Sequence, residues 1–133
     1  MEPQLVKACL DTHTVLWSLA GDPQLGKSAR RIIASSSRMS LIISDIVLLE
    51  VSYLSAKGRI DRSLCLDVLL TKIAESFRVI PIDPKIAALA TSLDLPHGDP
   101  FDRVIAATAV HHGVPLLTRD KLLKRSKAIE TIW

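Results

Sequence analysis

The chain has 133 residues, of which 48% are hydrophobic and only 4% aromatic. This length fits one compact domain over residues 1–133, with a core built mainly from Leu, Ile, Val and Ala. The 17 basic and 14 acidic residues give a net charge of +3, which by itself does not indicate nucleic-acid binding. No apolar run approaches the about 20 residues that cross a membrane, and the N-terminus lacks the features of a signal peptide, so we expect a cytoplasmic protein without a membrane contact.

The first half of the chain alternates short apolar runs that suit buried strands with longer patterns that suit helices. A strand that ends at Asp11 precedes a helix that ends at Gly21. Ser44 or Asp45 can cap a later helix, which is apolar on almost every side and is therefore expected to be central. In order, we predict a strand at 6–10, helices at 13–20 and 28–36, a strand at 40–43, and helices at 46–57 and 62–75.

The second half continues the alternation. Pro100 suits the first turn of a helix, and Gly113 suits its C-terminal cap. In order, we predict a strand at 77–82, helices at 84–93 and 100–112, a strand at 116–118, a helical turn at 121–123 and a strand at 129–133. This order predicts a three-layer α/β/α sandwich with a mostly parallel central sheet, in which ligands bind beyond the carboxyl ends of the strands.

The two cysteines bear on the compartment in which the protein works. Cys9 and Cys65 both lie inside apolar patterns. We interpret them as small buried side chains of a protein in a reducing compartment, and a disulfide between them is the alternative.

Four acidic residues lie where an apolar strand or helix pattern meets a loop. Asp11 and Asp120 follow predicted strands, Glu50 lies within an apolar helix, and Asp102 opens an Ala-rich helix. Carboxylates on core-facing elements destabilise the fold unless a partner compensates them, and a shared divalent cation can do so, since hard cations such as Mg²⁺ prefer oxygen ligands. Acids from distant parts of the chain at one site suggest metal-assisted phosphoryl chemistry.

Each acid also has a simpler interpretation. Asp11 and Asp120 can cap the turns that follow them, and Asp102 can complement a helix dipole. A Lys or Arg partner can satisfy Glu50. The four acids together, two of them just after predicted strands, favour a shared site over four separate structural roles.

Four motifs cover nearly the whole chain, and their order and separation resemble the PIN-domain family, in particular its VapC-like ribonuclease toxins of type II toxin–antitoxin pairs. The motifs are Leu10-Asp11-Thr12-His13-Thr14-Val15-Leu16-Trp17, Ser44-Asp45 followed by Glu50, His97-Gly98-Asp99-Pro100-Phe101-Asp102-Arg103, and Leu117-Thr118-Arg119-Asp120. The third motif is the most specific.

The resemblance implies an acidic quartet that binds Mg²⁺ or Mn²⁺, formed by Asp11, Glu50, Asp102 and Asp120. Asp99 resembles an extra aspartate of one subgroup, although it can cap the following helix instead. Thr118 resembles a hydroxyl residue that orients a carboxylate or a water. The implied reaction is hydrolysis of an RNA phosphodiester, in which Asp102 or Glu50 can also accept the proton of the attacking water.

Further residues have roles that the sequence leaves open. Arg103 and Arg119 can contact substrate phosphates, and a salt bridge to a neighbouring acid is the alternative for each. His13 and His97 adjoin acids, but we interpret them as loop or capping residues.

Partners and competing functions follow from the same comparison. The resemblance implies an antitoxin protein and a homodimer, and Leu64, Val68 and Leu69 are expected on a helix that the domain does not fully bury. The alternative function is an inactive PIN-fold module that binds RNA or protein, against which the four acids argue. A haloacid-dehalogenase phosphatase would carry Asp-x-Asp after its first strand, which Asp11-Thr12-His13 lacks.

Overall fold

The computed structural model describes residues 5–96 and 98–133. Its strands are β1 (Ala8–Leu10), β2 (Leu41–Ser44), β3 (Arg78–Ile80), β4 (Leu116–Leu117) and β5 (Thr131–Ile132). Its helices are α1 (Thr12–Ala20), α2 (Lys27–Ala34), α3 (Ile46–Ala56), α4 (Leu66–Ser76), α5 (Pro84–Ser92), α6 (Pro100–His111) and α7 (Lys121–Arg125), with a 3-10 turn at Arg38–Ser40.

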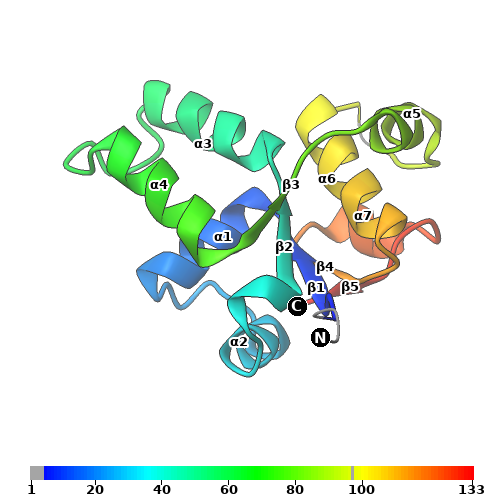
Figure 1. Ribbon diagram of the computed structural model, residues 1–133, viewed down its shortest axis with the longest axis horizontal. Coiled ribbons are helices and arrows are strands. Elements are labelled where there is room, and N and C mark those ends of the chain that lie inside the picture. Colours follow the sequence, from blue (N-terminus) through cyan, green and yellow to red (C-terminus); the bar gives the residue numbers. More distant parts are fainter. Residues whose placement is uncertain (1–4, 97) are drawn as a thin grey trace.

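The strands form one five-stranded sheet in the order β3-β2-β1-β4-β5, and every neighbouring pair is parallel. Helices α1, α3 and α4 lie on one side of this sheet, and α5, α6 and α7 lie on the other (Figure 1). Parallel strands need such helical crossovers, which bury both faces of the sheet. The predicted three-layer α/β/α sandwich is therefore confirmed, with a sheet that is parallel throughout.

Strand β1 is the point where the strand order reverses. The chain runs from β1 outward through β2 to β3, and then crosses the sheet to place β4 and β5 on the other side of β1. In open parallel sheets, ligands bind at the carboxyl ends of the strands beside this reversal. Asp11, which directly follows β1, lies at this position.

The core explains why the strands read as continuous apolar runs. All three residues of β1 have no exposed surface, and neither do Ile42 and Ile43 of β2. Helix α6 packs against β1 and β2 through Ala106, Ala107 and Ala109, which are fully buried. These small side chains let the helix approach the sheet closely, and this contact fixes the position of its N-terminal turn.

Two predictions are wrong, namely the start of the helix at 62–75 and the burial of Cys65. The helix predicted at 62–75 begins only at Leu66, so Leu64 and Cys65 lie before it and are exposed. Cys9 is buried as predicted, and both cysteines are free thiols, so no disulfide joins them. None of the helices in the described part of the chain has the length and hydropathy of a membrane-spanning segment.

Helix α3 is not central, although its sequence is apolar on almost every side. Only Val47 and Val51 are buried, and the side chains of Leu49 and Tyr53 are each 51% exposed. Tyr53 packs edge-on against Phe101 of α6, with ring centroids 5.9 Å apart. Helix α3 packs against α1, α4 and α6, and its remaining apolar face has contact with solvent.

Arg103 has a structural position that differs from the predicted substrate contact. Its guanidinium donates hydrogen bonds to the carbonyl oxygens of Ala90 at 2.7 Å, Leu93 at 2.6 Å and Leu95 at 3.4 Å. These acceptors lie in the last turn of α5 and in the loop that follows, where helix carbonyls lack partners of their own. Arg103 therefore joins the end of α5 to α6, and it is not among the residues that line the cavity described below.

Arg103→Met should lower the free energy of unfolding by about 1 to 3 kcal/mol, because partly buried carbonyl groups lose their donor. Urea denaturation measures the change. Arg119→Met is the matched control, because Arg119 is exposed, and it should stay within about 0.5 kcal/mol of the wild type. Equal stability of both variants would show that the Arg103 hydrogen bonds do not hold the two helices together.

Candidate active site

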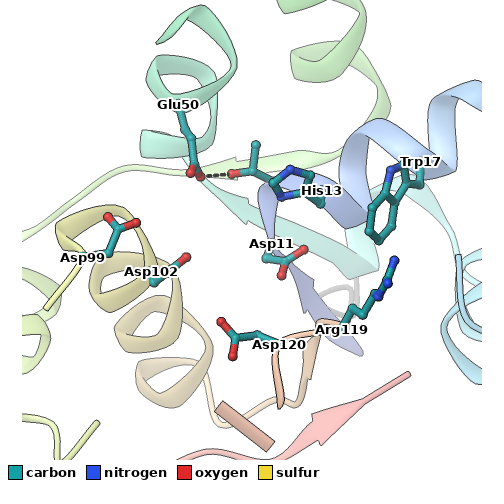
Figure 2. A pocket seen from close by; sticks show the side chains of 9 residues that line it. Asp11, His13, Trp17, Glu50, Asp99, Asp102, Arg119 and Asp120 are labelled. Atoms are coloured by element: carbon teal, nitrogen blue, oxygen red, sulfur yellow. Dashed lines mark hydrogen bonds between the residues drawn. The ribbon is translucent and has the colours of Figure 1, made fainter. Parts of the chain in front are cut away.

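A cavity of about 330 Å³ opens at the carboxyl edge of the sheet (Figure 2). It is lined by residues from β1, α1, α3, α6 and the β4–α7 turn, namely Asp11, Thr12, His13, Trp17, Glu50, Asp99, Asp102, Arg119 and Asp120. The four acids of the predicted quartet thus lie around one cavity, although up to 109 positions separate them in sequence. The first and third motifs supply most of its lining.

Asp11 is the most constrained of these acids. Its Oδ1 accepts hydrogen bonds from the Thr14 backbone amide at 3.0 Å and from the Thr14 hydroxyl at 2.6 Å. Its Oδ2 accepts one from the Thr118 hydroxyl at 2.5 Å. Asp11 is also the N-cap of α1, so the capping role and the site position coexist in one side chain.

Thr118 joins the ends of two strands. Its buried hydroxyl donates to Asp11 and accepts a hydrogen bond from the Asp120 backbone amide at 3.1 Å. Asp120 in turn caps α7, because its Oδ1 accepts hydrogen bonds from the amides of Leu122 at 2.8 Å and Leu123 at 3.2 Å. One hydroxyl group therefore sets the orientation of Asp11 relative to the turn that carries Asp120.

Glu50 lies on the face of α3 that turns toward β1. The buried Thr12 hydroxyl donates a hydrogen bond to its Oε1 (Figure 2). Burial raises the pKa of Glu50, the hydrogen bond from Thr12 opposes this, and the charges of Asp99 and Asp11 raise the pKa further. The neighbouring negative charges thus contribute to the raised pKa of Glu50, but the loss of hydration is the larger cause.

The start of α6 contributes two acids. Asp99 is the N-cap, and its Oδ1 accepts a hydrogen bond from the Phe101 amide at 2.9 Å. Asp102 lies in the first turn, and both side chains line the cavity. Asp99 therefore caps α6 and also lines the cavity.

The wall opposite these acids contains His13, Trp17 and Arg119 (Figure 2). The imidazole and indole centroids are 5.5 Å apart, and the Arg119 guanidinium carbon lies 5.6 Å from the centroid of the Trp17 ring. His13 is on α1 and faces the cavity, so its interpretation as a loop or capping residue is wrong. His97 lies outside the described residues.

Sequence reasoning missed Trp17 and Thr12 as site residues. Trp17 follows His13 by four positions on α1, and this spacing places both side chains on one helix face. That spacing was a usable signal. Thr12 gave no comparable signal, because its partner Glu50 is 38 positions away in sequence.

The donor chemistry of the cavity suits a hard divalent cation. Five carboxylates line it against one guanidinium, and carboxylate oxygens are the ligands that Mg²⁺ and Mn²⁺ prefer. Within residues 5–96 and 98–133, no three Asp, Glu, His or Cys side chains are arranged to coordinate one ion directly. The acids therefore share a cavity, and the chemistry of their oxygens, rather than a preformed coordination geometry, is what suits a cation.

Glu50→Gln should raise the midpoint of thermal unfolding in EDTA at about pH 7. The raised pKa means that protonation of Glu50 stabilises the folded state below its ordinary pKa, and that this contribution is lost as the pH rises through the raised value. A neutral glutamine keeps the acceptor for Thr12 without the buried charge.

The difference between Glu50→Gln and the wild type should shrink as the pH falls to about 4. Glu75→Gln, which removes an exposed carboxylate on α4, is the control and should leave the midpoint unchanged. Scanning calorimetry at both pH values measures the effect. A Glu50→Gln midpoint at or below that of the wild type at neutral pH would contradict the expected cost of the buried charge.

Comparisons with known proteins identify the family of this chain. The family model described as PIN domain matches residues 8–128. Ribonuclease VapC22 of Mycobacterium tuberculosis is 32% identical over 127 residues, which cover 93% of this chain and 96% of the relative.

Solved structures show the same fold at lower identity. DNA-bound VapBC from Salmonella typhimurium matches with a TM-score of 0.74 and 20% identity, over 96% of this chain and 98% of that one. VapBC2 from Rickettsia felis, bound to a promoter DNA fragment, matches with a TM-score of 0.68 and 19% identity, over the same shares of the two chains. By its sequence and its fold, the chain belongs to the PIN-domain family, within the VapC-like group.

Proposed function

We propose that this protein is a divalent-metal-dependent endoribonuclease that hydrolyses RNA phosphodiester bonds as the toxin of a toxin–antitoxin pair. The observation that carries the proposal is the gathering of Asp11, Glu50, Asp102 and Asp120 around one cavity at the carboxyl edge of the sheet. The name of the 32% identical relative, Ribonuclease VapC22, supports the same activity. A cytoplasmic location goes with this function.

The charge of the cavity explains why the reaction needs a cation. Five carboxylates repel an RNA phosphate, and among the described residues Arg119 is the only Lys or Arg that lines the cavity. Mg²⁺ or Mn²⁺ held by Asp11, Glu50, Asp102 and Asp120 would neutralise charge at the scissile phosphate and favour ionisation of the attacking water.

The protein residues then have separate tasks. Thr118 and Thr14 keep the Asp11 carboxylate in a fixed orientation, so that this acid needs no rearrangement when a ligand enters. Asp102 or Glu50 can also accept the proton of the attacking water at its carboxylate. Arg119 is exposed at the rim and can contact a neighbouring phosphate.

Five of the 14 acidic residues lie in this cavity, which leaves nine to balance the 17 Lys and Arg of the chain. The rest of the surface is therefore more basic than the net charge of +3 indicates. This basic surface favours attraction of RNA from a distance, while the acids at the centre select for a cation-bound phosphate.

Asp11→Asn should keep the fold and reduce cleavage of single-stranded RNA by about 100-fold or more, because it removes charge at the most constrained acid. EDTA should abolish wild-type cleavage, and added Mg²⁺ or Mn²⁺ should restore it. A gel assay with a labelled single-stranded RNA measures both effects.

Asp67→Asn, which neutralises an exposed acid in the first turn of α4, is the control and should cleave at the wild-type rate. Undiminished cleavage by Asp11→Asn, after contaminating nuclease is excluded, would reject this mechanism. Metal and RNA binding without cleavage by the wild type would favour the inactive binding module instead.

Partners belong to the same proposal. An antitoxin is expected, and a basic segment of that protein would complement the acidic cavity. A short neighbouring reading frame for a DNA-binding protein would support this partner. A homodimer is also expected, because apolar side chains on α3 and α4 remain exposed, with Val68 at 67% and Leu49 and Tyr53 at 51%.

Light scattering at micromolar concentration should give the mass of a dimer for the wild type. Val68→Glu should shift the mass toward the monomer, because a charge in an apolar interface loses its hydration. Met39→Glu is the control, since Met39 is also exposed but lies near the other end of the sheet from these helices. A wild-type monomer would refute the homodimer.

A further inference from the structure

The cavity has two chemically different walls. Asp99 and Asp102 lie on one side, Trp17 and the Arg119 guanidinium lie on the other side near His13, and Asp11 lies between them (Figure 2). Trp17 also lines a neighbouring groove of about 520 Å³ that contains Leu16, Leu54 and Leu69. Trp17 therefore lies between the acidic cavity and the apolar groove and lines both.

Packing against Trp133 covers only part of the Trp17 ring. One edge of Trp17 meets Trp133, with centroids 5.7 Å apart, and Trp133 in turn covers Gly26, where a Cβ atom would come within 2.5 Å of the Trp133 carbonyl carbon. This packing holds the C-terminal residue against α1 and α2. The rest of the indole remains partly exposed, beside an exposed imidazole and an exposed guanidinium.

Arg119 is held near the indole by a second contact. Its Nη1 donates a hydrogen bond to the side-chain oxygen of Gln24 at 3.0 Å, and its guanidinium carbon is 5.6 Å from the Trp17 ring centroid. The guanidinium lies over the indole ring. RNA-binding proteins stack unpaired bases on aromatic rings and on guanidinium planes, and such stacking tolerates every base.

We propose that Trp17 and His13 form a stacking site for one unpaired nucleobase of RNA, next to the phosphate that Arg119 contacts. The inference rests on the proposed ribonuclease function and names the part of the substrate that this wall receives. A cavity of about 330 Å³ lies at the lower end of the range for small-ligand sites, which suits one nucleotide.

The two kinds of contact in this site differ in how their contribution to the binding free energy depends on salt. The Arg119 contact is electrostatic, so it contributes to the salt dependence of RNA binding, whereas stacking on Trp17 contributes affinity with little salt dependence. The site therefore selects single-stranded RNA without reading its sequence.

The first test measures affinity for a labelled single-stranded RNA ten-mer of mixed sequence, in Mg²⁺ and in the non-cleaving Asp11→Asn background. Trp17→Leu should weaken binding by about 5-fold to 100-fold, and Trp17→Phe should restore most of it, because phenylalanine keeps an aromatic face. The salt slope of Trp17→Leu should match that of the parent, while Arg119→Gln should reduce the slope by about one.

Met39→Ala is the control for this series. Met39 is an exposed apolar residue that lines neither the acidic cavity nor the groove beside it, so its removal should leave the affinity within about 2-fold of the parent. Parent-like affinity of Trp17→Leu would overturn the stacking site. A loss equal to that of Met39→Ala would do the same.

The second test is spectroscopic and does not depend on how well Trp17→Leu folds. The chain has two Trp residues, so Trp133→Phe leaves Trp17 as the sole indole and Trp17→Phe leaves Trp133. The same RNA should quench the emission of the Trp133→Phe protein and leave that of the Trp17→Phe protein nearly unchanged. The reverse pattern, or equal quenching, would reject stacking on Trp17.

The outcomes separate this inference from the function on which it rests. A wild-type protein that neither binds nor cleaves RNA removes the proposed function and the stacking site together. A wild-type protein that cleaves RNA, with unquenched Trp17 and unchanged affinity in Trp17→Leu, removes only the stacking site and leaves Trp17 as a packing residue for Trp133.

Discussion

The hydrogen bonds that hold Asp11 are the interaction on which the rest of the site depends. Asp11 follows the central strand β1, and its two carboxylate oxygens accept hydrogen bonds from Thr14 on α1 and Thr118 after β4. The Thr14 hydroxyl also lies 2.8 Å from the carbonyl oxygen of Leu117, so its one proton is shared between two acceptors. This network fixes the carboxylate relative to the sheet and joins β1 and α1 to the segment after β4, which is distant in sequence.

The gathering of acids conflicts with stability in the absence of a cation. The cavity brings five carboxylates together, and burial with like charges raises the pKa of Glu50. Four of the five acids offset part of this cost with a structural bond, since Asp11, Asp99 and Asp120 cap helices and Glu50 accepts a hydrogen bond from Thr12. These caps let the protein fold with the charges in place, and functional sites commonly reduce stability in this way.

Two of the helices around the cavity contribute both to its lining and to other parts of the structure. Helix α3 presents Glu50 toward β1 and exposes Leu49 and Tyr53 on another face, and α1 presents His13 and Trp17 to the cavity while Val15 is buried in the core. Helix α3 thus supplies an acid of the cavity and an exposed apolar surface, and α1 connects the core to the aromatic wall. The cavity and the exposed apolar surface therefore occupy neighbouring faces of the same two helices.

The sequence alone determined the class of fold and the acids of the site. Apolar runs and helical periodicity are local properties, so the order of strands and helices, the parallel sheet and the edge that carries Asp11 could be read directly. Helix boundaries depend on local turns as well as on periodicity. The helix predicted from residue 62 begins at Leu66, because Asp61 forms a turn by accepting hydrogen bonds from the amides of Ser63 and Leu64.

Only the tertiary structure decided which side chains meet. The partners in the Thr12–Glu50 and Thr118–Asp11 hydrogen bonds are 38 and 107 positions apart, and no local pattern encodes such a pairing. The contact of Arg103 with the end of α5, the exposure of Cys65 and the aromatic wall around Trp17 likewise depend on how the helices cross the sheet. Periodicity shows which face of an element is apolar, and packing alone determines what that face contacts.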